Sequence, residues 1–323
     1  MESLFLRTAP PLGPAWLAFE EQSGLNNPRQ ELPIAEHQTA YAAACRSLNA
    51  KMLAPGARDH HLSLNVTKTE LTVPSTLASP SGDEANRYQI PVIRYQHATA
   101  SSAGESAAAG SQAEEKQPDK SSHSPTVSCP LILPKTAYHC LSVLNYILNQ
   151  HRSNSTKNKL ILAGSSSGGQ LAALLSQNPT TLGTIHGVLL RCPVTSDAFN
   201  GLDPYVPLRF RHLHTSAWDP SFWNSLLGQM KRAVPWDGLE RMPLEADEET
   251  LKELPRTWIQ LCTNDSLYSD GLCYAKMLEE AGVEVKVDVV RGWPHTFWLK
   301  APELERALEV EEEMVRGLGW LLG

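Results

Sequence analysis

The clearest candidate for a catalytic residue in this chain is a serine at the centre of a glycine-flanked turn. Gly164-Ser165-Ser166-Ser167-Gly168 fits the pattern G-x-S-x-G, with Ser166 midway between the two glycines. The apolar run Lys159–Ala163 leads into this turn, and the helical pattern QLAALLSQ leaves it. A strand, a sharp turn and a helix in this order form a nucleophile elbow, which projects a serine hydroxyl above the sheet edge. We therefore predict that Ser166 is a nucleophile; the alternative is a loop rich in Gly and Ser that carries no chemistry.

A serine hydroxyl becomes a good nucleophile only beside a base that a carboxylate orients. Asp265 follows the apolar strand WIQLC, and His295 follows the alternating strand VEVKVDVV. In parallel sheets the loops after the strands meet at one edge, so we predict a triad of Ser166, His295 and Asp265. Two alternatives stay open: Asp265 is only a turn residue, or Asp270, which also suits the N-cap of the next helix, is the acid.

The elements around these residues alternate between strands and helices, which indicates an α/β fold with a mainly parallel sheet and helices on both faces. Strands are expected at residues 159–163, 187–194, 258–262 and 283–290, and helices at 136–151, 170–177, 270–281 and 302–322. The N-terminal half predicts a helical patch at 32–53 and strands at 62–73 and 90–95. Residues 98–125 are poor in aliphatic residues and are expected to form a low-complexity flexible loop within a single domain spanning 1–323.

Composition narrows the range of partners. The net charge of −7, without a cluster of Lys and Arg, argues against nucleic acid and favours a small-molecule substrate. The six cysteines have no zinc-binding spacing, so no metal site is expected, and Cys192, Cys262 and Cys273 are predicted to be small buried hydrophobic residues. No apolar run is long enough to span a bilayer, and the N-terminus does not resemble a secretory signal. We expect a cytoplasmic protein; the oligomeric state stays open.

The chain resembles the hormone-sensitive-lipase-like α/β-hydrolases in two blocks. GSSSGGQLAALL is similar to that family's G-D-S-A-G-G-N-L-A motif, although Ser165 stands where the family has an acidic residue. Leu254–Phe297 is similar to the C-terminal block in which the triad Asp, a helix ending in A-G-V, a strand and the H-x-F histidine follow one another. The resemblance implies the α/β-hydrolase fold, carboxylic-ester hydrolysis and no cofactor. It also implies that residues 1–56 form an N-terminal cap and residues 198–250 an inserted helical cap.

The oxyanion hole departs from the family pattern. The H-G-G-G motif, whose amides stabilise the oxyanion in that family, does not occur in the sequence. In one alignment His97-Ala98-Thr99-Ala100 occupies its place, so that the amides of Ala98 and Thr99 join that of Ser167. In the other alignment the strand IPVIRY matches the preceding family strand, and of the usual donors only the Ser167 amide remains. Each lost donor typically costs about 2.7–4 kcal/mol in transition-state stabilisation.

Aromatic residues gather between Asp197 and Asp237, and among them Trp218 and Trp223 are the candidates for substrate contact; packing of a cap helix is the alternative. We therefore expect a serine hydrolase that cleaves a carboxylic ester, or a related acyl or amide bond, of a small apolar molecule such as a product of secondary metabolism. The missing H-G-G-G motif supports a second hypothesis: a non-hydrolytic or impaired member, either a lyase or cyclase or a ligand-binding protein. A third is a damaged chain that has lost a core strand at 98–125.

Overall fold

A computed structural model of the chain describes residues 1–25, 27, 33–77, 88–97, 132–153, 159–196, 208–213 and 241–323. These residues divide into two compact units. One comprises Met1–Arg29 and Leu133–Gly323, and the other comprises Gln30–Ile132. All of the candidate site residues that the structure describes belong to the first unit.

The second unit contains two helices and a pair of antiparallel strands. Helix α2 (Ile34–Leu53) and the short helix α3 (His60–Ser63) precede strands β1 (Val66–Pro74) and β2 (Gln89–His97). The two strands pair antiparallel from Val66 opposite His97 to Pro74 opposite Gln89. The predicted strand beginning at residue 62 is wrong at its start, because residues 60–63 are helical and Asn65 has a left-handed backbone with φ 59°. That conformation interrupts the extended chain, so the alternating pattern becomes a strand only from Val66 onward.

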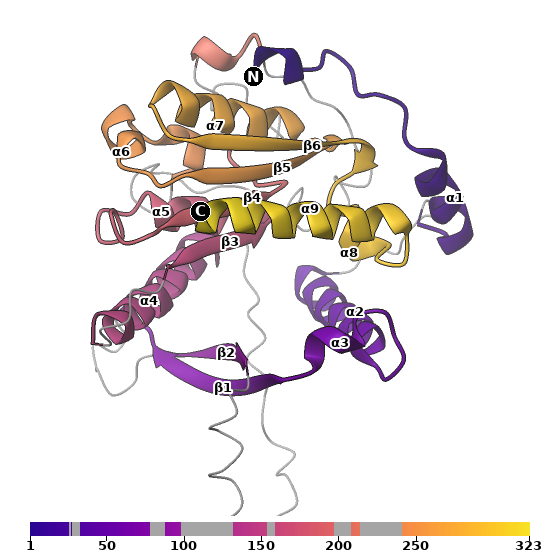
Figure 1. Cartoon of the computed structure of the whole chain (residues 1–323), viewed down its shortest axis with the longest axis horizontal. Coiled ribbons are helices and arrows are strands. Elements are labelled where there is room, and N and C mark those ends of the chain that lie inside the picture. Colours follow the sequence, from indigo (N-terminus) through magenta and orange to yellow (C-terminus); the bar gives the residue numbers. More distant parts are fainter. Residues whose placement is uncertain are drawn as a thin grey trace, which may run out of the picture. The chain divides into compact units, whose positions relative to one another are not determined.

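The first unit is built on a parallel sheet, shown in Figure 1. Strands β3 (Ile161–Ser165), β4 (Gly187–Arg191), β5 (Thr257–Asn264) and β6 (Val285–Pro294) lie side by side in that order, and each neighbouring pair is parallel. Every residue of β4 is buried. An all-parallel sheet needs covering on both faces because the loops that return the chain cross over it. The predicted α/β class with a mainly parallel sheet is confirmed.

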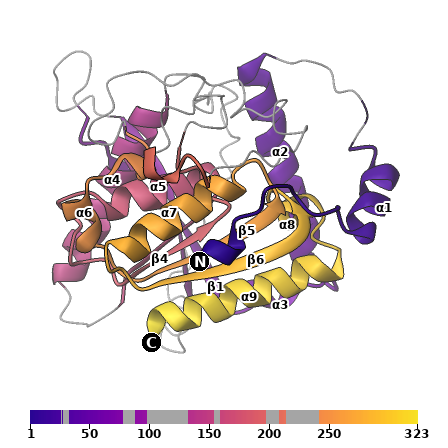
Figure 2. The ribbon, with the colours of Figure 1, turned by 90° about the horizontal axis from the view of Figure 1, so that it is seen from above.

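Helices cover the two faces of this sheet, as Figure 2 shows. Helices α5 (Ser167–Ser176) and α7 (Tyr268–Glu280) lie on one face, and the C-terminal helix α9 (Glu305–Leu322) lies on the other. Successive strand residues point to opposite faces, so Leu190 joins the core cluster that includes α5 and α7. Leu189 and Trp258 instead pack against Leu321 of α9. The sheet edge where β3 and β5 end is thereby held between two helical layers.

The remaining elements belong to the first unit, which resumes at Leu133, one residue into α4. They are η1 (Glu2–Leu4), α1 (Pro14–Ser23), α4 (Ile132–Ser153), η5 (Leu208–Phe210), η8 (Pro243–Glu245), α6 (Glu248–Lys252) and α8 (Phe297–Lys300). The predicted loop at 98–125 lies outside the described residues, as does most of the predicted inserted cap at 198–250. Among the helices that are described, none is long and apolar enough to cross a membrane.

Candidate active site

Ser166 sits on a strained turn between a strand and a helix. It follows β3 directly and is the N-cap residue of α5, with φ 55° and ψ −121°. Its amide donates to the carbonyl of Arg191 at 2.9 Å, and its carbonyl accepts from the amides of Gln170 at 3.1 Å and Val194 at 3.3 Å. A non-glycine residue in this region of backbone space costs about 1–3 kcal/mol, so the surrounding hydrogen bonds must hold it there. The predicted strand–turn–helix context of Ser166 is present.

The glycines around the turn differ in whether the structure requires glycine at their positions. A Cβ at Gly164 would lie 2.1 Å from the carbonyl oxygen of Gly168, a backbone atom that cannot move aside. A Cβ at Gly169 would lie 3.0 Å from the Pro193 side chain. At Gly168, by contrast, nothing in the described part of the chain lies within 4 Å of that position. Close approach of the backbone therefore explains Gly164 and Gly169.

The loops after β5 and β6 bring an acid and an imidazole to Ser166. Nδ1 of His295 lies 2.6 Å from Oδ2 of Asp265, and Nε2 of His295 lies 3.0 Å from Oγ of Ser166. Because an ionised carboxylate only accepts hydrogen bonds, the neutral ring carries its proton on Nδ1, and Nε2 accepts from the serine hydroxyl. The structure thus brings together all three side chains that the sequence selects. A relay of this kind can withdraw the serine proton during attack on a carbonyl carbon.

Asp265 and the competing acid Asp270 make different contacts. Oδ1 of Asp265 accepts from the Leu267 amide at 2.9 Å, so this buried carboxylate makes a turn bond and the histidine contact at once. Asp270 instead accepts from the Ser196 hydroxyl at 2.9 Å. It is not the N-cap of α7, because that helix begins at Tyr268 and Asp270 lies in its first turn.

Electrostatics favour the charged form of the imidazole. Burial on its own would lower the pKa of His295, but the attraction of the Asp265 carboxylate, their hydrogen bond and the neighbouring Cys192 sulfur together outweigh burial. The net effect raises the pKa of His295 above its ordinary value of 6.5. The side chain of Asp265 is only 1% exposed and that of His295 13% exposed, so water screens this attraction weakly. Asp265 is therefore placed to stabilise the imidazolium that forms when the serine gives up its proton.

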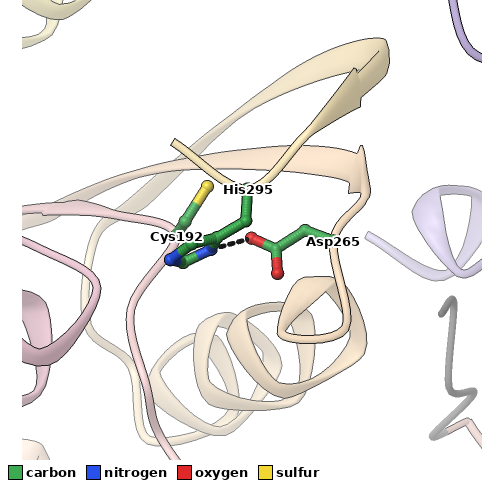
Figure 3. Close-up of side chains that lie close together, drawn as sticks. All are labelled: Cys192, Asp265 and His295. Carbon is green, nitrogen blue, oxygen red and sulfur yellow. Dashed lines mark hydrogen bonds and ion pairs between the residues drawn. The ribbon is translucent and has the colours of Figure 1, made fainter. Parts of the chain in front are cut away.

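Cys192 is a neighbour of the imidazole whose contact the sequence does not predict. It follows β4 with a positive φ of 44° and is fully buried, as expected for a small hydrophobic residue. Figure 3 shows its side chain beside His295. Its sulfur, an imidazole nitrogen and a carboxylate oxygen of Asp265 all lie within 4.8 Å of one another, which is a donor set that soft divalent metals accept. The sequence shows that Cys192 follows a strand, but which side chain it contacts depends on the arrangement of the strands in the sheet.

The predicted oxyanion and substrate residues are only partly described. Ser167 is the first residue of α5, directly after the nucleophile, so its amide is one of the helix N-terminal donors without an intrahelical partner. Such an amide can face a developing negative charge. Ala98, Thr99, Trp218 and Trp223 lie outside the described residues, and their roles stay predictions.

Comparison with known proteins agrees with this geometry. The family described as having the alpha/beta hydrolase fold matches residues 130–299, which is more than half of the chain. The chain belongs to the α/β-hydrolase family. Three curated relatives of this hydrolase extend the assignment. This α/β-hydrolase is 45% identical over 65 residues to bovine neutral cholesterol ester hydrolase 1, and the match covers 17% of this chain and 16% of the relative.

The other two relatives carry names from the same chemistry. Versiconal hemiacetal acetate esterase of Dothistroma septosporum is 26% identical over 174 residues, which is 51% of either chain. Human arylacetamide deacetylase-like 4 is 34% identical over 92 residues, covering 28% of this α/β-hydrolase and 21% of the relative. These matches place the hydrolase in the hormone-sensitive-lipase-like branch that its sequence resembles. They span about half of each relative's length or less.

Solved structures show the same fold over nearly the whole chain. A vibralactone cyclase aligns with a TM-score of 0.64 and 19% identity, covering 98% of this α/β-hydrolase and 96% of the cyclase. A bacterial heroin esterase aligns with a TM-score of 0.59 and 16% identity, covering 97% and 99% respectively. At these identities the similarity concerns the fold alone.

Proposed function

We propose that this hydrolase cleaves carboxylic esters of small apolar molecules by a serine acyl-enzyme mechanism. The observation that carries the proposal is the continuous relay from the Ser166 hydroxyl through His295 to Asp265, with separations of 3.0 and 2.6 Å. The names of the relatives support the class of substrate, because each name contains an ester hydrolase, an esterase or a deacetylase.

The geometry gives each side chain a step. Oγ of Ser166 attacks the ester carbonyl carbon while Nε2 of His295 takes the hydroxyl proton, and Asp265 stabilises the imidazolium through Nδ1. The carbonyl oxygen becomes an oxyanion that the Ser167 amide at the N-terminus of α5 can stabilise. His295 then protonates the leaving alcohol. In the second half, water loses a proton to His295, attacks the acyl group and releases the acid, which restores the Ser166 hydroxyl.

A second candidate is an acyl transfer that uses no water. A hydroxyl of the acyl group itself can attack the acyl-enzyme in place of water, which releases a lactone and again restores the serine. The absence of H-G-G-G from the sequence raises this candidate because it separates the chain from the ester hydrolases that it resembles, although both reactions pass through two oxyanions. The similarity in fold to a vibralactone cyclase is compatible with it.

One experiment tests the proposal and separates the two candidates. Purified protein is treated with a fluorophosphonate probe and assayed with short p-nitrophenyl esters, with Ser166→Ala as the matched control. We expect labelling at Ser166 and ester turnover that the substitution removes. For a hydroxyacyl ester, mass spectrometry distinguishes the hydroxy acid from the lactone, which is lighter by one water. Wild-type protein that is folded, unlabelled and inactive would contradict the proposal.

A further inference from the structure

We propose that the N-terminal segment Pro10–Gly13 is a clasp that fixes the relative positions of Asp265 and His295, with Asn264 and Gly13 as positioning residues. The inference rests on the proposed function, because the clasp serves the relay on which that function depends. It concerns residues that are far from the nucleophile in sequence and lie outside the relay of Ser166, His295 and Asp265.

Pairing between β5 and β6 does not by itself fix the distance between Asp265 and His295. Strands β5 and β6 pair in continuous register from Thr257 to Cys262, and the register then shifts before Asn264 pairs with Pro294. Asp265 and His295 stand immediately beyond this irregularity. A β-bulge disrupts the ladder and bends its strand, so regular strand pairing alone does not fix the distance between the two loops. Other contacts must do so.

The first anchor holds the residue next to the acid. The Nδ2 group of Asn264 donates to the Pro10 carbonyl at 2.7 Å, and its Oδ1 accepts from the Thr263 hydroxyl at 2.9 Å. The Asn264 side chain is thus held at both of its ends. Because Asp265 follows directly in the chain, this contact restricts where its carboxylate can lie.

The second anchor holds the strand that carries the base. The Gly13 amide donates to the Gly292 carbonyl at 2.8 Å, and the Gly292 amide donates to the Thr263 hydroxyl at 2.8 Å. Gly292 has a positive φ of 78°, and a Cβ there would lie 3.1 Å from the Pro11 carbonyl oxygen. Thr263 therefore belongs to both anchors, and the hydrogen bonds close a ring through β5, the N-terminal segment and β6.

An aromatic cluster extends the clasp to the far side of the histidine. Trp16 of α1 is 1% exposed and contacts Trp293 and Phe297 in edge-on geometry, with ring centroids 6.3 and 6.4 Å apart. Trp293 and Phe297 stand two residues before and two residues after His295, and their rings lie 4.3 Å apart. The single helix that follows the clasp thus packs against both flanks of the turn that carries the imidazole.

The expected consequence is catalytic rather than only structural. A misplacement of about 1 Å in a catalytic group costs about a hundredfold in rate even when its cause lies far from the chemistry. Loss of an anchor should lower kcat more than it raises KM, because the anchors act on the position of the relay. It should also weaken the hydrogen bond between His295 and Asp265, which the low-field proton resonance of Nδ1 reports in NMR without any substrate.

The test uses a matched pair at Gly13. Its φ is −63°, which proline adopts, so Gly13→Pro does not force φ; it removes the donated hydrogen bond and places Cδ against the Gly292 carbonyl, which must move away. Gly13→Ala keeps the amide, and its Cβ would meet its nearest atom, the Gly292 carbonyl oxygen, at an ordinary 3.5 Å. Asn264→Ala removes the other anchor. We expect a decrease in kcat of about ten- to a hundredfold in Gly13→Pro and Asn264→Ala, with a shifted or broadened Nδ1 proton, and wild-type behaviour in Gly13→Ala.

The outcomes separate the clasp from the proposed function. Folded Gly13→Pro and Asn264→Ala proteins with wild-type kcat and an unchanged Nδ1 proton would overturn the clasp. So would a loss of activity explained entirely by a lower melting temperature while the Nδ1 proton stays in place. A wild-type protein that turns over no ester would contradict the proposed function, whereas the NMR comparison of the two Gly13 variants would still decide whether the clasp exists.

Discussion

Replacing Asp265 by asparagine should disable the relay through the tautomer of His295. Oδ1 of Asp265 accepts from the Leu267 amide at 2.9 Å, and an asparagine oxygen can keep that bond. Its amide nitrogen would then occupy the place of Oδ2, which lies 2.6 Å from Nδ1 of His295. Two donors cannot face each other, so the ring would move its proton to Nε2. The imidazole could then no longer accept the proton of Ser166.

The expected decrease in kcat follows from the loss of the correct His295 tautomer. A wrong tautomer in a serine triad, with the geometry otherwise preserved, lowers kcat by about 10⁴-fold, which corresponds to about 5.4 kcal/mol of barrier. The pH profile should change as well. Because the carboxylate raises the pKa of His295, wild-type kcat/KM should rise with pH only above the ordinary imidazole value of 6.5. Removing the charge lowers that pKa, so the acid limb of the variant should move to lower pH while its plateau falls.

The assay is kcat/KM for a p-nitrophenyl ester across the pH range, with Asp270→Asn as the control. Asp270 is equally buried but bonds Ser196 rather than the histidine, so its replacement should cost about 1–3 kcal/mol of stability and leave the acid limb in place. An Asp265→Asn protein that is folded, loses less than about a hundredfold and keeps the wild-type limb would refute the reasoning.

Three further perturbations probe the site and its scaffold. Gly164→Ala would place a Cβ 2.1 Å from a backbone oxygen, so we expect a loss of stability above about 3 kcal/mol in urea unfolding and no fluorophosphonate labelling. Gly319→Ala in α9 meets nothing within 4 Å in the described part of the chain and should stabilise by about 0.5–1 kcal/mol, measured in the same way. Cd²⁺ should inhibit the enzyme through Cys192, Asp265 and His295, and Cys192→Ala should raise the concentration needed for half-inhibition; equal sensitivity of the two proteins would contradict this.

Much of the α/β core could be predicted because the residues within and next to each element determine where it begins and ends. The run WIQLC is apolar except for Gln260 because β5 is buried along nearly its whole length, and its position before Asp265 is visible in the sequence. Gly282 ends α7 with φ 85°, as a glycine after a helix indicates. The convergence of the triad residues then follows from parallel strands that end at one edge.

What could not be predicted depends on contacts between distant segments. The residues around Trp16 show no clear helical periodicity, and nothing local indicates that this side chain packs against Trp293 and Phe297. Cys192 was expected to be a buried hydrophobic residue and is buried, but its place beside His295 depends on how β4 and β6 are arranged in the sheet. Asn65 gave no sign of the left-handed turn that delays β1.

Backbone strain in the described residues gathers at the site, and this connects the clasp to the relay. Four non-glycine residues in the described part of the chain have positive φ. Three of them, Ser166, Cys192 and Thr296, lie at the site, and Thr296 is directly beside His295. Each such conformation costs about 1–3 kcal/mol and persists only where the surroundings impose it. At Ser166 backbone hydrogen bonds to the end of β4, to α5 and to the residues after β4 do this, and at Cys192 a bond from its amide to the Gln260 carbonyl at 2.8 Å contributes. At the histidine turn, where the strand register has just shifted, the aromatic packing of Trp16 and the Gly13–Gly292 bond supply the constraint. The N-terminal segment therefore constrains the turn that carries His295, as the end of β4 and the residues after it constrain the turn that carries Ser166.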